Sequence, residues 1–328
     1  AVRIADKIMN IFLFILTNNL IPIFALILLG IVLGKKFSLD VGTLSKINLY
    51  AFVPFFMFVN IYTTEFRADM IAAAVIVILI IPINRLIGSL IGKIRKYDQS
   101  LTNAFANSIM FFNSGNFGIP LITMVFSSKL FQVNGEMPYL NFAMTIQIII
   151  VIIQNTAANT IGVFNASRAE GNIKDALKKA LNMPSFYAVI LAFVFKLIPY
   201  NLEQLPIWPA LNYVKDGVIS LALISLGVQL SQTKIKLADP DVLLSSFVRL
   251  IGGPIIAFIM VSLFGIKGVM AQTLIISSSI PTAVNTAMIG AEFNNSPDFA
   301  SRAVMVSTLL SSITLTAVIY AAGILFPV

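Results

Sequence analysis

The sequence predicts an all-helical integral membrane protein. Of its 328 residues, 58% are hydrophobic and 11% are charged, and the mean hydropathy is +0.92. That balance lies far from the composition of a soluble domain. The apolar runs reach about 20 residues each, the length at which a helix crosses a hydrocarbon core, and no alternating segments of about ten residues suggest a membrane barrel. We therefore predict a bundle of membrane-spanning helices.

Ten apolar runs are long enough to be read as spans. In chain order they cover residues 11–34, 42–62, 70–91, 101–127, 138–164, 185–199, 209–230, 242–265, 269–290 and 304–327. The first run exceeds the apolar region of a signal peptide and lacks a small-residue cleavage pattern, so we expect a retained span. The chain begins at Ala1 without an initiator Met, which is compatible with processing or engineering of its first residues. The sixth run is the shortest, and Lys196 near its end is expected to reach the interface by snorkelling.

Loop charges predict the orientation, since short cytoplasmic loops collect Lys and Arg. With the N-terminus outside, twelve basic residues fall in cytoplasmic loops and five in outer segments. The twelve are Lys35, Lys36, Lys93, Arg95, Lys96, Arg168, Lys174, Lys178, Lys179, Lys234, Lys236 and Arg302. We therefore expect a multi-pass protein of the cytoplasmic membrane with both termini outside.

A basic linker divides the spans five and five. Residues 165–184 carry Ile173, Leu177 and Leu181 at helical spacing beside Lys and Arg, which predicts an amphipathic helix on the inner surface. A repeat with an odd number of spans changes orientation when it is duplicated in tandem. We therefore predict two inverted five-helix repeats, residues 1–164 and 185–328.

Helix-breaking residues interrupt the fourth and ninth spans. They lie in the segments 113–120 and 277–285, at matching places in the two halves. A break at membrane depth is tolerated only where protein or a polar cavity surrounds it, and paired breaks point to a transporter binding site. The half-helix that begins at a break suits an anion and the half that ends there suits a cation. We expect Gly115, Gly118, Pro120 and Pro281 to shape the crossing of these two spans.

Neutral polar side chains at the breaks are candidates for binding a small organic anion. Asn113, Asn116 and Asn285 could orient a carboxylate without a buried charge, and Gln147 in the fifth span is a further candidate. Gln147 and Gln154 are seven residues apart and share one face of that span. The alternative is a pair of proline kinks in packed helices, with Asn and Ser bonding between helices.

Ionisable residues within spans are suspects for ion coupling. Asp216 could titrate in proton-coupled transport, although pairing with Lys215 is the favoured reading. Arg85 and Arg249 occupy comparable places in the third and eighth spans, where snorkelling or binding to carbonyls is favoured over function. The chain has no Cys and no His, which removes thiol chemistry and the commonest zinc ligands. We expect no metal site, no cofactor, no nucleic-acid partner and no enzymatic activity.

Several segments together resemble the auxin efflux carrier family. They are Asn48 to Pro54, Asn113 to Leu121, Ser225 to Leu230, Pro281 to Asn285 and Ser307 to Ser311. The family includes plant auxin carriers and bacterial permeases for malate, malonate and related acids, and the short linker suits a bacterial member.

The resemblance implies the fold of sodium/proton antiporters and bile-acid symporters, with crossed fourth and ninth helices. It also implies a scaffold domain, a transport domain that moves in an elevator-like manner, and a homodimer. Asn113 and Pro120 match the Asn and Pro of the first crossing, where the substrate carboxylate would sit, and Pro281 matches the proline of the second.

The function predicted is a secondary transporter for a small organic acid such as malate, malonate or an auxin-like carboxylate. One alternative is a sodium-coupled organic-anion symporter, in which oxygens of Ser114, Asn116, Thr282 and Asn285 hold Na⁺. Another is a membrane sensor that binds its ligand without flux. The sequence leaves open the substrate, the coupling ion, whether Na⁺ or H⁺, and the direction of transport.

Overall fold

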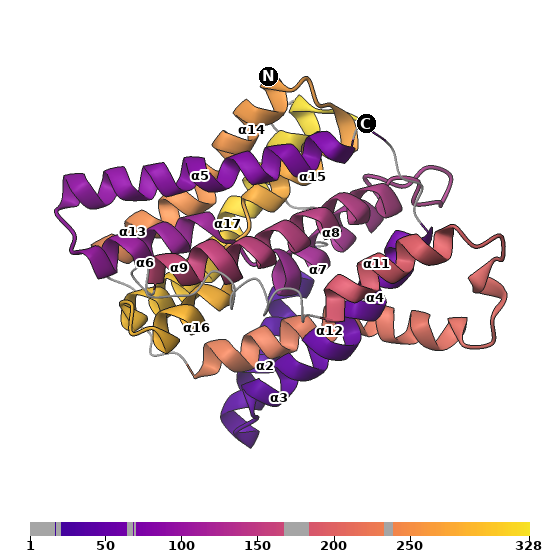
Figure 1. Cartoon of the computed structure of the whole chain (residues 1–328), viewed down its shortest axis with the longest axis horizontal. Coiled ribbons are helices and arrows are strands. Elements are labelled where there is room, and N and C mark those ends of the chain that lie inside the picture. The colour runs from indigo at the N-terminus through magenta and orange to yellow at the C-terminus, as the bar shows by residue number, and fades with distance from the viewer. Residues whose placement is uncertain (1–16, 18–20, 64–67, 69, 167–183, 233–238) are drawn as a thin grey trace.

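The protein is built from helices, as the sequence predicts. The computed structural model describes residues 17, 21–63, 68, 70–166, 184–232 and 239–328, and these residues contain helices and turns but no strand (Figure 1). The amphipathic linker helix predicted for residues 165–184 falls almost entirely outside the described residues.

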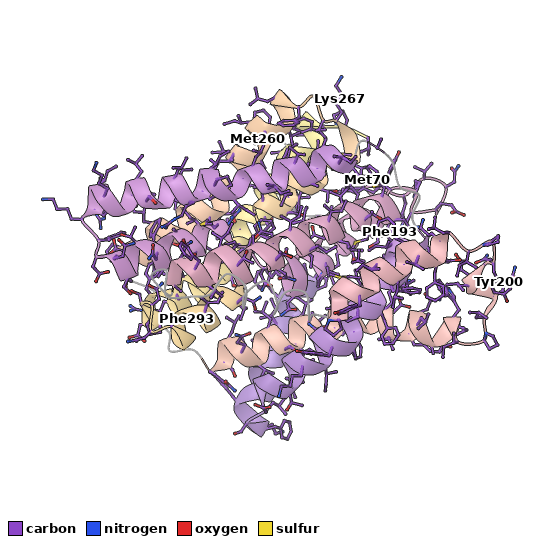
Figure 2. All side chains as sticks on the ribbon, viewed as in Figure 1. Met70, Phe193, Tyr200, Met260, Lys267 and Phe293 are labelled. Carbon is purple, nitrogen blue, oxygen red and sulfur yellow. The ribbon has the colours of Figure 1, made fainter. Side chains whose placement is uncertain are left out.

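Five described helices are long and apolar enough to cross a membrane. They are Met70–Arg95, Leu140–Ala166, Trp208–Ser231, Pro240–Leu263 and Pro297–Leu325. Shorter apolar helices cover Tyr50–Thr63, Tyr187–Lys196 and Gly268–Ser278. The outer side chains are apolar as well: Phe193 of α11, labelled in Figure 2, is 43% exposed. These features confirm the class of a multi-pass membrane protein.

One set of helices packs around α12, and we call it the α12 group. It runs from the bottom of Figure 1 to the right, with α2 and α4 against α12 and with α11 against α4. Its members are α2 (Ile21–Phe37), α3 (Val41–Ile47), η2 (Asn48–Phe52), α4 (Val53–Thr63), α11 (Pro184–Lys196), η5 (Leu202–Gln204) and α12 (Trp208–Ser231).

Two glycines let α2 and α12 touch backbone to backbone. A Cβ on Gly30 would meet the carbonyl oxygen of Ile224, and a Cβ on Gly227 would meet the carbonyl oxygen of Ile27. A Cβ on Gly34, one turn along α2, would meet the side-chain hydroxyl of Ser231. Small residues spaced four apart allow this close packing in membranes, where helices gain little from apolar burial.

The remaining helices form a second set, which we call the crossing group. Its longest members, α5 and α17, run beside the broken helices, with α5 against α6 and α17 against α13, α15 and α16. The members are α5 (Met70–Arg95), α6 (Gln99–Met110), η3 (Ser114–Gly118), α7 (Ile119–Ser127), α8 (Leu140–Ala157), η4 (Ala158–Gly162), α9 (Val163–Ala166), α13 (Pro240–Phe247), η6 (Val248–Gly252), α14 (Gly253–Leu263), α15 (Gly268–Ser278), α16 (Val284–Glu292) and α17 (Pro297–Leu325).

The two groups meet where η3 and α7 pack against α12 and where α4 packs against α8. An edge-to-face aromatic pair, Phe24 and Phe117, joins them with ring centroids 6.2 Å apart. Asn48 of η2 also donates its side-chain N–H to Asn116 Oδ1 of η3 at 2.8 Å. The first interruption therefore lies at the contact between the two groups.

Candidate functional site

The two interrupted helices pair with each other at their breaks. Asn113 N donates to Pro281 O at 2.9 Å, and Ala283 N donates to Phe111 O at 2.9 Å. These bonds form an isolated antiparallel bridge between Phe112 and Thr282. Backbone groups freed by a break in a membrane helix need partners within the protein. Here each break supplies partners for the other.

The local sequence explains how the first break is held open. Helix α6 ends at Met110, and Asn113 O then accepts hydrogen bonds from Phe117 N at 3.3 Å and Gly118 N at 2.9 Å. Pro120 follows in the first turn of α7, a position where its fixed φ suits a helix. The chain thus leaves one helix, makes one wide helical turn and starts the next.

The first break presents polar atoms that have no partner in the protein. Asn113 is 7% exposed and its Nδ2 makes no hydrogen bond. Asn48 is buried, and its Oδ1 is likewise unpartnered while its Nδ2 binds Asn116. A Cβ added to Gly115 would meet nothing within 4 Å, so open space adjoins this turn. A buried polar atom without a partner is unfavourable unless a ligand or water satisfies it.

Side chains at the second break are mostly satisfied by the protein. Thr282 is fully buried, its Oγ1 donates to Ser108 O at 2.9 Å, and its N–H donates to Ser307 Oγ at 3.1 Å. Asn285 in the first turn of α16 is half-buried. Of the second-break candidates, Asn285 therefore keeps partial exposure, whereas Thr282 serves the packing of the crossing.

Gln147 of α8 connects the two breaks. Its Nε2 donates to Ser114 O at 2.7 Å, and its Oε1 accepts from Ser277 Oγ at 2.5 Å. The side chain is fully buried, and a Cβ on Gly118 would lie 2.5 Å from its Nε2. Both polar atoms of the amide are thus engaged, and Gly118 makes the room for it.

Arg249 of η6 lies between the ends of α6 and α15, the helices that precede the two breaks. Its guanidinium donates to Ile109 O at 2.5 Å and to Ser278 O, near the last residues of α6 and α15. The side chain is fully buried, and its Cζ lies 5.0 Å from the ring centroid of Phe112. Gly253, one turn later, makes the space, because a Cβ there would meet Arg249 and Ser278 O.

The other ionisable candidates lie in different surroundings. Asp216 is 68% exposed and pairs with Lys215 at 3.6 Å, the arrangement favoured from the sequence. Arg85 is half-buried and donates to Asn103 Oδ1 at 3.1 Å. Within the described part of the chain, no group of three or more His, Cys, Asp or Glu side chains could hold a metal ion.

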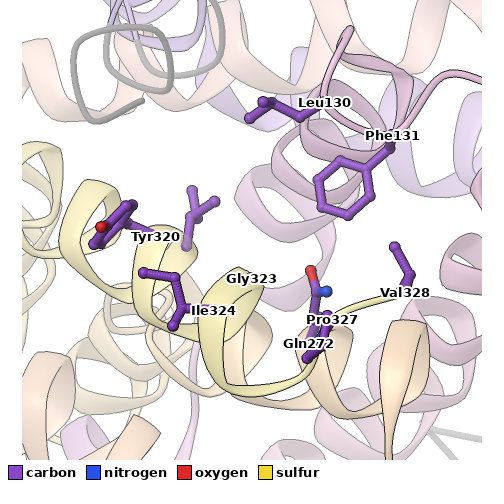
Figure 3. Close-up of a pocket in the computed structure, with 9 residues that line it drawn as sticks. Leu130, Phe131, Gln272, Tyr320, Gly323, Ile324, Pro327 and Val328 are labelled. Carbon is purple, nitrogen blue, oxygen red and sulfur yellow. The ribbon is translucent and has the colours of Figure 1, made fainter. Parts of the chain in front are cut away.

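A separate cavity of about 280 Å³ opens beside the end of α17 (Figure 3). Tyr320 and Ile324 of α17, Gln272 of α15 and Phe131 line it, together with Leu130 and Val328. None of the residues predicted from the sequence to bind substrate contributes to its wall.

Sequence reasoning missed three residues that complete the crossing: Asn48, Ser277 and Ser307. All three are buried: Asn48 binds Asn116 and Ser307 binds Thr282, both at a break, while Ser277 at the second break donates to Gln147. An Asn in the otherwise apolar run after Lys46 was a usable signal, since polar residues in spans face the bundle interior. The serines carried no such signal, because Ser is common in membrane helices.

A helical membrane protein whose two broken spans pair beside unsatisfied polar side chains has the features of a membrane transporter. The chain belongs to the family described as membrane transport protein, whose model matches residues 15–319. This assignment confirms the resemblance to the auxin efflux carriers and indicates a transporter rather than an enzyme.

Three relatives carry transporter names. An uncharacterized transporter of Methanothermobacter thermautotrophicus is 23% identical over 311 residues, which cover 91% of this chain and 96% of the relative. An uncharacterized transporter of Methanocaldococcus jannaschii is 27% identical over 144 residues, 43% of this chain and 47% of the relative. A Rhizobium meliloti protein named "Putative malonate transporter" is 27% identical over 139 residues, 42% of each chain.

Proposed function

We propose that the protein is a secondary carrier that moves a small organic acid anion across the cytoplasmic membrane. The observation that carries this proposal is the buried, unpartnered Nδ2 of Asn113, two residues along the chain from the open space at Gly115. A donor held in such a place is suited to an acceptor that arrives from outside the protein, and a carboxylate oxygen is the strongest such acceptor.

The start of η3 adds further donors. The amides of Gly115 and Asn116 lie in its first turn, where backbone N–H groups lack intrahelical acceptors and the helix end carries about half a positive charge. Together with Asn113 they favour a carboxylate without a buried ionised side chain. Asn285, half-buried at the start of α16, supplies the corresponding position of the second break.

The proposed architecture is ten spans in two inverted five-helix repeats, with both termini outside and two copies in a dimer. In this proposal the α12 group is the scaffold and the crossing group moves as an elevator against it. The division of helix contacts into these two groups supports the proposal, as does the bond between Asn48 and Asn116 at their boundary. Movement would have to break that bond.

One residue expected at the substrate, Gln147, and one expected to couple an ion, Thr282, receive different roles here. Gln147 has both amide atoms engaged with Ser114 and Ser277, so we assign it to holding the breaks together rather than to touching substrate. Thr282 is engaged through both its hydroxyl and its amide. For the substrate, the name of the Rhizobium meliloti relative supports a small dicarboxylate such as malonate.

Flux into proteoliposomes tests this proposal. Malonate, malate, smaller monocarboxylates and an aromatic acetic acid are supplied in turn, each with an imposed pH gradient or an imposed sodium gradient. Saturable uptake of at least one acid is expected, and Asn113→Ala should reduce it. Stabilisation of the protein by an acid in the absence of any flux would instead favour a ligand sensor.

A further inference from the structure

The site that would attract a cation at the crossing is occupied by a side chain of the protein itself. Helices α6 and α15 both end at the crossing, and the carbonyl end of a helix carries roughly half a negative charge. Two such ends facing one buried point sum to about one negative charge. The guanidinium of Arg249 donates to a carbonyl of each.

The charge of Arg249 is balanced by these carbonyls and by an aromatic ring rather than by a carboxylate. Among the described residues, Arg95, Lys215 and Arg302 form ion pairs with aspartates. Arg249 instead binds Ile109 O and Ser278 O, and it lies over the ring of Phe112. An arginine side chain stays protonated in proteins, so this positive charge is permanent.

From this arrangement we infer that Arg249 is a built-in cation, which takes the place that Na⁺ would need at the half-helix ends. Two consequences follow. The crossing needs no metal ion to hold it together, and transport by the proposed carrier needs no sodium. Arg249 is a positioning residue, because it acts through α6 and α15. Its hydrogen bonds go to Ile109 O and Ser278 O and not to the side chain of Asn113.

The stability of the purified protein tests this inference without any assay of transport. The wild-type protein in detergent should unfold at the same temperature in sodium chloride and in choline chloride of equal ionic strength. Arg249→Ala should unfold at a lower temperature, and guanidinium chloride at sub-denaturing concentration should restore part of the loss, whereas urea should not. The ring of Phe112 and the two carbonyls remain to bind the added cation.

Arg85→Ala is the matched control, since Arg85 is also an arginine of a spanning helix but contacts Asn103. Its stability should not respond to guanidinium. If Arg249→Ala cannot be purified, Arg249→Lys, which retains the charge with one nitrogen, should unfold at a lower temperature than the wild type. Stabilisation of the wild type by Na⁺ specifically would overturn the inference, and so would an Arg249→Ala protein as stable as the wild type.

The transport consequence rests on the proposed function and is measured separately. Uptake of the transported acid should be equal with and without external Na⁺. A sodium requirement overturns the inference even if the proposed function holds. If no acid is transported at all, the proposed function fails while the stability results still decide the role of Arg249.

Discussion

Asn48 and Asn116 form a side-chain hydrogen bond of 2.8 Å across the boundary between the α12 group and the crossing group. Asn48 belongs to the span that packs on α12, and Asn116 to the turn inside the first break. The bond is polar and lies in a mostly apolar boundary, beside the ring contact of Phe24 and Phe117. The bond therefore forms only when the two groups have the relative position seen in this conformation.

Cross-linking this pair should arrest transport. The chain has no Cys, so Asn48→Cys/Asn116→Cys introduces two thiols without background. A short thiol-specific cross-linker should join them and abolish flux, because the two groups could no longer move apart. Each single-Cys variant treated with the same reagent is the control. Full activity of the cross-linked protein would exclude relative motion of the two groups at this boundary.

Asn113→Ala should weaken substrate binding more than it weakens the fold. A hydrogen bond to a charged group contributes about 1.5–3 kcal/mol, so affinity for the acid should fall roughly ten- to hundredfold. Little stability should be lost, because Asn113 Nδ2 has no partner within the protein.

The matched control for this variant is Asn60→Ala, at a buried asparagine of α4 whose Nδ2 donates to Phe56 O. It should leave affinity unchanged. Concentration-dependent uptake and thermal unfolding measure the two effects. Unchanged uptake by a folded Asn113→Ala protein would remove Asn113 from the site.

Gln147→Leu should destabilise the crossing. The substitution leaves Ser114 O and Ser277 Oγ without their partner, and each unsatisfied buried group costs about 1–3 kcal/mol. Gln154→Leu on the same helix face is the comparison, since Gln154 has one long contact of 3.4 Å and an unpartnered Nε2. The unfolding temperature should fall further for Gln147→Leu than for Gln154→Leu. The reverse order would contradict the bracing role assigned to Gln147.

Gly30→Ala should loosen the packing of α2 on α12. The added methyl meets the backbone of Ile224 and Gly227, and overpacking of this kind costs about 1–3 kcal/mol. Gly323→Ala provides the control, because a Cβ at that position of α17 meets nothing within 4 Å. Thermal unfolding of the two variants measures the difference. Equal stability of both would show that α2 can shift without loss.

Stability should fall at high pH through Tyr97, which lies in the turn between α5 and α6. Burial raises the pKa of Tyr97 above its usual value of 10.0, and its hydroxyl binds Asp241 Oδ1 at 2.5 Å. The folded state thus retains the proton longer than the unfolded chain. This contribution is fully present below pH 10 and is lost as the pH rises through the raised pKa.

The measurement is thermal unfolding between pH 8 and 11 for the wild-type protein and for Tyr97→Phe. The variant cannot ionise at this position, so its stability should decline less steeply with pH. Identical slopes for the two proteins would show that the hydroxyl of Tyr97 contributes nothing to the pH dependence.

The sequence predicted the all-helical membrane class and the position of both interruptions. Apolar length identifies spans, and Gly, Pro and Asn within an apolar run mark a break irrespective of the rest of the chain. The partners at the crossing could not be predicted in this way. Arg249 binds Ile109 across 140 residues of chain, and Ser277 binds Gln147 across 130, and neither pairing has a local pattern.

The exchange of hydrogen bonds between the two breaks also constrains how the chain is made. Asn113 N has no partner until Pro281 has been synthesised, and Phe111 O has none until Ala283 has been synthesised. The carbonyl oxygen of Ser108 likewise depends on the hydroxyl of Thr282, 174 residues later. The first break therefore has backbone groups that its own segment does not pair. The segment around Asn113 can therefore complete its hydrogen bonds only after the segment around Thr282 has been made.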